Sequence, residues 1–249
     1  MEKNLLNNYV HTLLESLEQN LSAYTKVKKP EHLHSLRVDI KKIIAIFSFA
    51  ENIYKEKHHA TRLKPLFHKA GKIREMHINI HLLRAAPHPP ERLITRLKKK
   101  ENILIQQFIK KGPRYIMNIK AFREKVCLPE ILRSKKTIIK YFDKQRRKAN
   151  KIIQHNDREG MHRYRKRIKK IMYLYNALPE RMQSKIDLNE AEINKQQKKL
   201  GDWHDTYSAL NYFSHEHFLI QTSAYILKLK EKEKRQYNTL LINLIDQRK

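Results

Sequence analysis

The chain has 249 residues, and its 54 lysines and arginines against 25 acidic residues give a formal net charge of +29. Hydrophobic residues make up 40% of the sequence, enough to fill the core of one large domain or two small ones, which excludes a disordered chain. This much positive charge repels itself unless an anionic partner compensates it, and nucleic acid, an anionic membrane or polyphosphate each qualifies. The single cysteine, Cys127, excludes an intramolecular disulfide framework.

Two further features bear on location. The first residues lack the basic start and apolar run of a secretory signal, so we expect the protein in the reducing cytoplasm. The longest apolar stretches, such as 43–50, are far shorter than the roughly 20 residues that span a bilayer. We therefore expect neither a membrane segment nor a membrane partner.

Segments with helical periodicity follow one another along the chain, and most of the prolines fall between them. The predicted helices are 2–27, 31–54, 58–85, 90–111, 133–156, 160–178, 187–214 and 216–247. Segment 113–128 is predicted as a linker with room for one more turn or short helix. Pro65 lies inside the third predicted helix, where it requires a kink or a later start. Because alternating polar and apolar runs are absent, we predict an all-α fold.

Two pairs of segments are similar to one another at nearly constant separation. HSLRVDIKKI begins at His34, and HRYRKRIKKI begins 128 residues later at His162. AGKIRE around Gly71 and LGDWHD around Gly201 form the second pair, 130 residues apart. We interpret these pairs as a tandem duplication, with a first four-helix repeat over 1–128 and a second over 129–249.

The two matched helices each divide into an apolar arc and a basic stripe when residues are placed about 100° apart. The arcs, predicted to face a core, are Leu33, Leu36, Ile40, Ile43, Ile44 and Phe47 in the first copy and Met161, Tyr164, Ile168, Ile171, Met172 and Tyr175 in the second. The stripes are His34, Arg37 and Lys41, with Lys42 further round, and His162, Arg165 and Lys169, with Lys170 further round. A lone basic stripe is usually a solvated surface. Because a solvated face needs only polarity and the same cations recur here, we predict that both stripes bind an anion.

These residues resemble the CHAD domain, the conserved histidine α-helical domain. The resemblance rests on the two stripes and on the motifs GKIRE and GDWHD, and it covers nearly the whole chain. It implies two four-helix bundles related by pseudo-twofold symmetry, a basic central channel that binds inorganic polyphosphate, and attachment to polyphosphate granules. The usual arginine-aspartate pair after the glycine is replaced by Arg74-Glu75 in the first copy and by His204-Asp205 in the second. Lysines also replace several arginines. Because lysine is a point charge and not a planar fork of donors, we expect less directional binding of an anion.

Further basic side chains extend the predicted polyphosphate site. Those around the motif glycines are His68, Lys69 and Arg74 in the first copy and Lys198 and Lys199 in the second. Those on predicted helix 133–156 are Lys140, Lys144, Arg147, Lys148, Lys151 and His155. Predicted helix 2–27 carries no counterpart of this second stripe, so the stripe is either part of the anion groove or plain surface, and both interpretations stay open.

The other residues of the glycine motifs and stripes have more modest expected roles. We expect Glu75 and Asp205 to orient a cation from a neighbouring helix. Gly71 and Gly201 are expected to permit close packing. Phosphates nearby raise the pKa of a histidine, which suits His34 and His162 for a tunable positive charge.

Catalytic and metal chemistry have little support in the sequence. His77 and His81 are four residues apart and His215, Glu216 and His217 are consecutive, but HExxH and paired CxxC motifs are lacking, so we predict no metal site. A glycine-rich phosphate cradle with lysine, clustered carboxylates for Mg²⁺ and a GxSxG elbow are also missing, so we predict a binder without a cofactor rather than a polyphosphate hydrolase.

Nucleic-acid binding is the nearest alternative function, because the net charge permits it. No recognition-helix motif and no aromatic RNA-binding platform is evident, and Trp203 is the single tryptophan. Inorganic polyphosphate is therefore the preferred partner.

Overall fold

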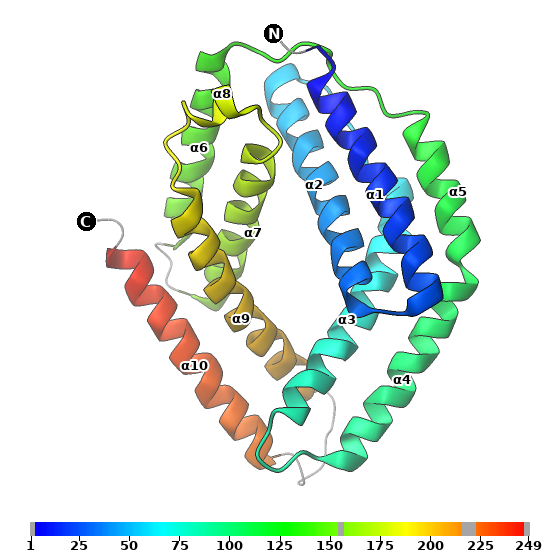
Figure 1. The fold of residues 1–249 in the computed structure, drawn as a ribbon. Coiled ribbons are helices and arrows are strands. Elements are labelled where there is room, and N and C mark those ends of the chain that lie inside the picture. The colour runs from blue at the N-terminus through cyan, green and yellow to red at the C-terminus, as the bar shows by residue number, and fades with distance from the viewer. Residues whose placement is uncertain (1–2, 154–156, 216–222, 247–249) are drawn as a thin grey trace. The chain divides into compact units, whose positions relative to one another are not determined.

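The computed structural model describes residues 3–153, 157–215 and 223–246. Within these ranges the chain forms α-helices joined by short loops, and the β-structure in the described part is limited to an isolated bridge between Lys3 and Ile131 (Figure 1). The prediction of an all-α fold is confirmed. None of the described helices is long and apolar enough to cross a membrane.

The helices follow the predicted ranges closely. Their bounds are α1 (Leu5–Val27), α2 (Pro30–Tyr54), the 3₁₀ helix η1 (Thr61–Leu63), α3 (Lys64–Arg84), α4 (Glu91–Lys110), α5 (Gly112–Arg123), α6 (Lys135–Ile153), α7 (Arg158–Tyr175), α8 (Glu180–Gln183), α9 (Glu190–His215) and α10 (Ser223–Asp246). The predicted linker 113–128 thus contains a full helix, α5. Residues 154–156 and 216–222, which we predicted as helical, lie outside the described residues.

Prolines explain where several helices begin. Pro65 is in the first turn of α3, where a missing backbone N–H breaks no helical hydrogen bond, so the helix starts late rather than kinking. Pro113 occupies the same kind of position in α5. Helix α7 ends at Tyr175, earlier than predicted, and Pro179 then serves as the N-cap of the short α8.

The chain folds into two compact units, and each draws on both halves of the sequence. Unit 1 consists of Met1–Arg74, Asn102–Arg147 and Lys169–Asp187, and unit 2 of Glu75–Glu101, Lys148–Ile168 and Leu188–Lys249. The predicted repeats 1–128 and 129–249 describe similarity within the sequence, which these units do not test. The duplication and its boundaries stay a prediction.

In unit 1, α1 packs against α2, and α5 packs against both α1 and η1 (Figure 1). The apolar arc of α2 is buried at five of its six positions. Ile44 is the exception, with 44% of its surface exposed, so its prediction as a core residue is wrong. Ile44 lies at the edge of the arc, next to the basic stripe. A side chain at the edge of an apolar arc is less fully covered by neighbouring helices than one at its centre.

In unit 2, α9 packs against α10. The indole of Trp203 is fully buried, and its Nε1–H donates a hydrogen bond to Glu233 on α10 over 2.8 Å. Arg158, at the start of α7, binds both carboxylate oxygens of Glu233 at 2.9 Å. The second apolar arc, Met161 to Tyr175, is buried at all six predicted positions, three of them in unit 2 and three in unit 1. That prediction is confirmed.

Candidate functional site

Arg37 is held in place by two contacts with α3 in unit 1. Its guanidinium carbon lies 4.2 Å from the centre of the Phe67 ring, and its Nη1 donates a hydrogen bond to the Phe67 carbonyl oxygen over 2.5 Å. Gly71 leaves space for this arrangement, because a Cβ atom at that position would lie 3.1 Å from the guanidinium carbon and closer still to Nη1. Gly71 therefore permits close packing, and the group that packs against it is the cationic guanidinium of Arg37.

His34 lies on the same stripe of α2, among further cations. Burial lowers the pKa of His34 to about 4, and the positive charges of Arg74, Lys169, Lys41 and Arg37 contribute in the same direction. The residue nevertheless keeps an exposed surface. We call these five residues, from α2, α3 and α7, the unit 1 cluster. Its histidine is neutral at pH 7, and its other four members are cationic.

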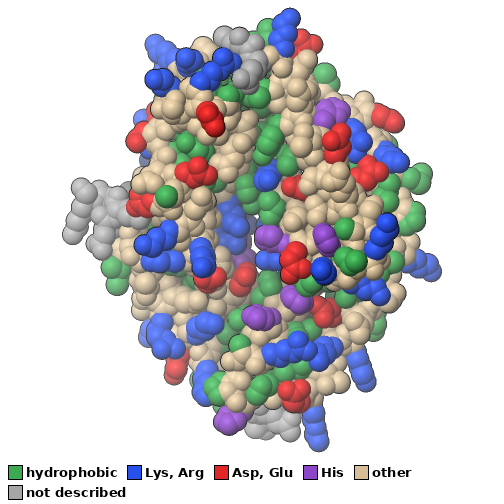
Figure 2. All heavy atoms as spheres, viewed as in Figure 1, with side chains coloured by type: hydrophobic (Ala, Val, Ile, Leu, Met, Phe, Trp, Pro, Cys, Tyr) green, Lys and Arg blue, Asp and Glu red, His purple; other side chains and the backbone are tan. Residues whose placement is uncertain are grey.

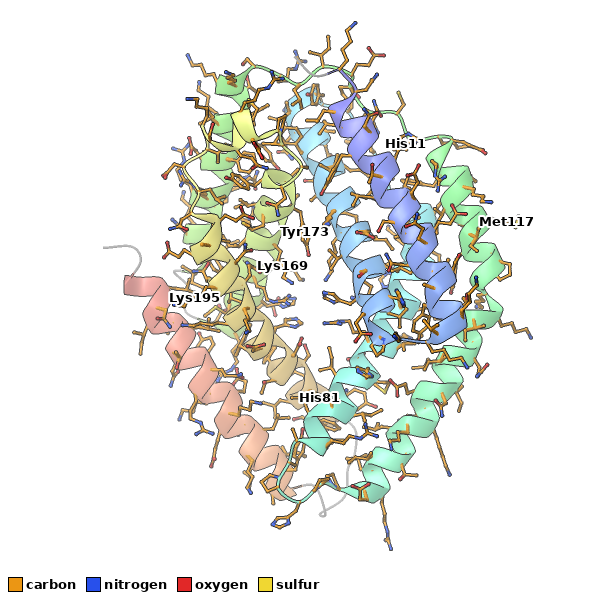
Figure 3. The ribbon with its side chains drawn as sticks, viewed as in Figure 1. His11, His81, Met117, Lys169, Tyr173 and Lys195 are labelled. Carbon is orange, nitrogen blue, oxygen red and sulfur yellow. The ribbon has the colours of Figure 1, made fainter. Side chains whose placement is uncertain are left out.

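Lys169 reaches this cluster from α7, which is distant along the chain from both α2 and α3. Lys169 and Tyr173 lie on the side of α7 that is turned toward α2 (Figure 3). The neighbouring Lys170 donates a hydrogen bond to the Ser48 hydroxyl, which links α7 directly to α2. Figure 2 shows Lys and Arg side chains in blue and His side chains in purple over much of the face that it draws. The sequence predicted each of these cations as a ligand, but it did not predict that Lys169 lies close to the cations of α2 and α3.

Lys42 lies beside an acidic residue of its own helix. Its ammonium nitrogen lies 4.0 Å from a carboxylate oxygen of Asp39, one helical turn earlier. Burial raises the pKa of Asp39, while the Ser16 hydrogen bond and Lys42 act in the opposite direction. Part of the charge of Lys42 is thus compensated within the protein.

Unit 2 contains a second group of basic side chains. The rings of His162 and His204 stack with their centres 4.7 Å apart and their planes 17° from parallel. Arg165 lies against Gly201, where a Cβ atom would be 3.9 Å from its Nη2. We call His162, Arg165 and His204 the unit 2 cluster. Asp205 lies 3.7 Å from His204 Nδ1 on the same helix.

The same two relations occur in both clusters. The stripe arginine lies against the motif glycine, as Arg37 does at Gly71 and Arg165 does at Gly201. The stripe histidine lies near the basic residue three positions after that glycine, which is Arg74 in unit 1 and His204 in unit 2. His204 was not among the predicted site residues. The alignment of the two glycine motifs would have identified it, because it takes the place of Arg74.

The remaining predicted ligands stand apart from these contacts. His68 is exposed, with its ring 5.8 Å from that of Phe67, and Lys69 is half-buried. The exposed ones are Lys140, Lys144, Arg147, Lys151, Lys198 and Lys199. Among the contacts described, none joins these side chains to either cluster, so their role as ligands stays a prediction. His155 lies outside the described residues.

The structure describes some of the residues that the sequence analysis considered as metal ligands. His77 Nδ1 lies 3.4 Å from a carboxylate oxygen of Glu101. Within the described ranges, no group of three or more His, Cys, Asp or Glu side chains is arranged to hold a metal ion. Glu216 and His217 lie outside those ranges.

Comparisons with known proteins agree with this architecture. The family model of the CHAD domain matches residues 8–212. The crystal structure of the CHAD domain from the plant Ricinus communis superposes with a TM-score of 0.68 at 13% sequence identity, covering 98% of this chain and 91% of that chain. A comparison with curated proteins found no match. CHAD domains are associated with polyphosphate binding and are generally non-catalytic. Since the family model spans most of its length, this chain belongs to the CHAD domain family.

Proposed function

We propose that this protein binds inorganic polyphosphate, without catalysis, through the unit 1 and unit 2 clusters. The observation that carries the proposal is the electrostatic environment of His34. Every charge that shifts its pKa is positive, and the four side chains that supply these charges come from three different helices. Like charges brought together by the fold repel one another unless an anion compensates them.

The side chains suit successive phosphates of a linear chain. Arg37 offers donors in a fixed fork, and its stacking on Phe67 restricts the guanidinium before any ligand arrives. Lys41 and Lys169 add point charges to the same cluster. A long polyphosphate makes many such contacts at once, whereas orthophosphate makes few, so affinity is expected to increase with chain length and decrease with salt.

We extend the proposal to the use of both clusters by one polyphosphate chain, as the CHAD resemblance implies. Each cluster has a stripe arginine beside the motif glycine and a stripe histidine in matching positions, which supports a common ligand chemistry. Attachment to polyphosphate granules follows as the cellular role that the family resemblance suggests.

The first experiment measures affinity against phosphate chain length at physiological salt. We expect long-chain polyphosphate to bind far more tightly than orthophosphate, and equal affinities would refute the proposal. Incubation with Mg²⁺ should leave the chain length unchanged, and shortening would reveal a hydrolase. DNA or RNA that displaced polyphosphate at equal phosphate concentration would favour the nucleic-acid alternative.

The second experiment reverses charge at the clusters. Arg37→Glu combined with Arg165→Glu should abolish binding while circular dichroism shows unchanged helix content. The matched control is Arg92→Glu with Arg96→Glu, two exposed arginines of α4 outside both clusters. Equal loss in the control would mean that diffuse electrostatics, not the clusters, governs binding.

A further inference from the structure

A concave site lies in unit 1, lined by none of the unit 1 cluster residues. It is a pocket of about 320 Å³, formed where the end of α2, the following loop, η1 and the segment after α5 come together. This volume is at the lower end of the range for small-molecule sites. The function proposed above makes no use of it.

The floor of the pocket is aromatic. The rings of Phe47 on α2 and Phe122 on α5 lie with their centres 6.0 Å apart, and both side chains are anchored in the core. The packing of α5 on η1 fixes the two walls relative to each other. The two ring planes are tilted by 48° to each other, so the floor presents an angled apolar surface that is formed before a ligand binds.

The rim of the pocket is basic. Lys57, Arg62 and Lys125 are exposed and belong to three separate segments, and every charged side chain that lines the pocket is basic. Thr61 adds a hydroxyl group. His58 lies on the wall, with its ring 5.4 Å from that of Phe47 and its Nε2 3.5 Å from a carboxylate oxygen of Glu56. An anionic group is thus favoured at the mouth and an apolar body at the floor.

The pocket and the unit 1 cluster are different sites on α2. Phe47 follows Arg37 by ten residues, which is about 15 Å along a helix axis. It also belongs to the buried apolar arc, whereas Arg37 and Lys41 belong to the basic stripe. A ligand in this pocket would therefore not occupy the cluster.

We propose that this pocket binds a small phosphate ester with a planar aromatic body, the class that nucleoside monophosphates represent. The phosphate is placed among Lys57, Arg62 and Lys125, and the aromatic body lies against Phe47 and Phe122. Inorganic phosphate would leave the apolar floor unused. An uncharged aromatic molecule would leave the three cations uncompensated.

The test is calorimetric titration of the full chain with adenosine 5′-monophosphate, adenosine and inorganic phosphate. We expect the monophosphate to bind at least about tenfold more tightly than either of its parts, since both halves of the pocket contribute. Arg62→Gln with Lys125→Gln should reduce this affinity at least about tenfold and leave polyphosphate binding at the clusters unchanged. Both residues are exposed, so the fold should survive.

Matched variants separate this proposal from the one above. Arg37→Glu with Arg165→Glu should abolish polyphosphate binding and retain the monophosphate. Loss of the monophosphate in that variant, or its full retention in Arg62→Gln with Lys125→Gln, would overturn the pocket proposal. Equal affinities for the monophosphate and inorganic phosphate would also overturn it, whatever the result with polyphosphate.

Discussion

At the scale of single residues, His34 connects the charge of the unit 1 cluster to pH. Burial and four neighbouring cations lower its pKa to about 4, so the ligand-free protein holds it neutral at pH 7. From the sequence we expected a raised pKa for His34, because that expectation was for a histidine beside bound phosphates. Both directions are compatible, since the cations act on the free protein and the phosphates act in the complex.

Polyphosphate binding should therefore become tighter as pH falls from about 7 to about 5. Bound phosphates raise the pKa of His34, so the complex takes up a proton that the free protein does not hold. Titration calorimetry at constant ionic strength should show a steeper increase for the natural protein than for His34→Gln. An identical pH dependence in the two proteins would contradict this role.

The same pKa shift has the reverse consequence for stability without ligand. The unfolded chain protonates this histidine near 6.5 and the folded chain near 4, so the unfolded state binds more protons between these values. Stability should decrease as pH falls through this window. Urea unfolding of His34→Gln should show a smaller decrease than the natural protein, and an equal or larger one would be inconsistent with the lowered pKa.

The two motif glycines form a matched pair for substitution by alanine. At Gly71 a methyl group would displace the Arg37 guanidinium, whereas at Gly201 it would meet Arg165 at an ordinary contact distance of 3.9 Å. We expect Gly71→Ala to weaken polyphosphate binding. Gly201→Ala should leave binding nearly unchanged and stabilise α9 by up to about 1 kcal/mol. Equal binding by both variants would show that the Arg37 position is unimportant.

At the scale of helices, Glu233 joins three elements of unit 2. Its buried carboxylate accepts hydrogen bonds from Arg158 on α7 and from Trp203 on α9, while Glu233 itself lies on α10. Helices whose apolar faces alone decide their packing can slide along one another. A shared carboxylate fixes their register, because both donors must meet it.

Glu233→Ala should destabilise the protein by about 1 to 3 kcal/mol in urea unfolding, because the buried Trp203 N–H loses its acceptor. Glu233→Gln keeps an acceptor and should cost less. The control is Asp143→Ala, which removes a partly exposed ion pair with Arg146 and should cost at most about 1 kcal/mol. A Glu233→Ala effect no larger than that of the control would show that the carboxylate does not fix the packing.

At the scale of the whole molecule, the net charge of +29 opposes folding in the absence of an anion. Raising salt from about 0.05 M to about 0.5 M shortens the range of this repulsion and should raise the Tm of the ligand-free protein. Polyphosphate at low salt should raise Tm further, because it binds the folded state. A Tm that falls with salt would indicate that attractive ion pairs outweigh the repulsion.

Local sequence patterns determined the secondary structure and the identity of most candidate ligands. Helical periodicity located the helices, and proline chemistry explained the late start at Pro65 and the start of α5 near Pro113. The recurrence of cations in two similar segments identified the stripes. These inferences succeed because the spacing of residues along a helix depends only on local geometry.

Only the tertiary structure decided which of these cations come together. It brings Lys169 to His34 and Lys170 to Ser48, and it seats Arg37 between Phe67 and Gly71. It also pairs His162 with His204 and leaves the lysines of α6 exposed. Periodicity says which face of a helix a residue occupies but not which distant helix that face meets. That choice depends on the packing of both apolar arcs at once, and the packing is a property of the whole fold.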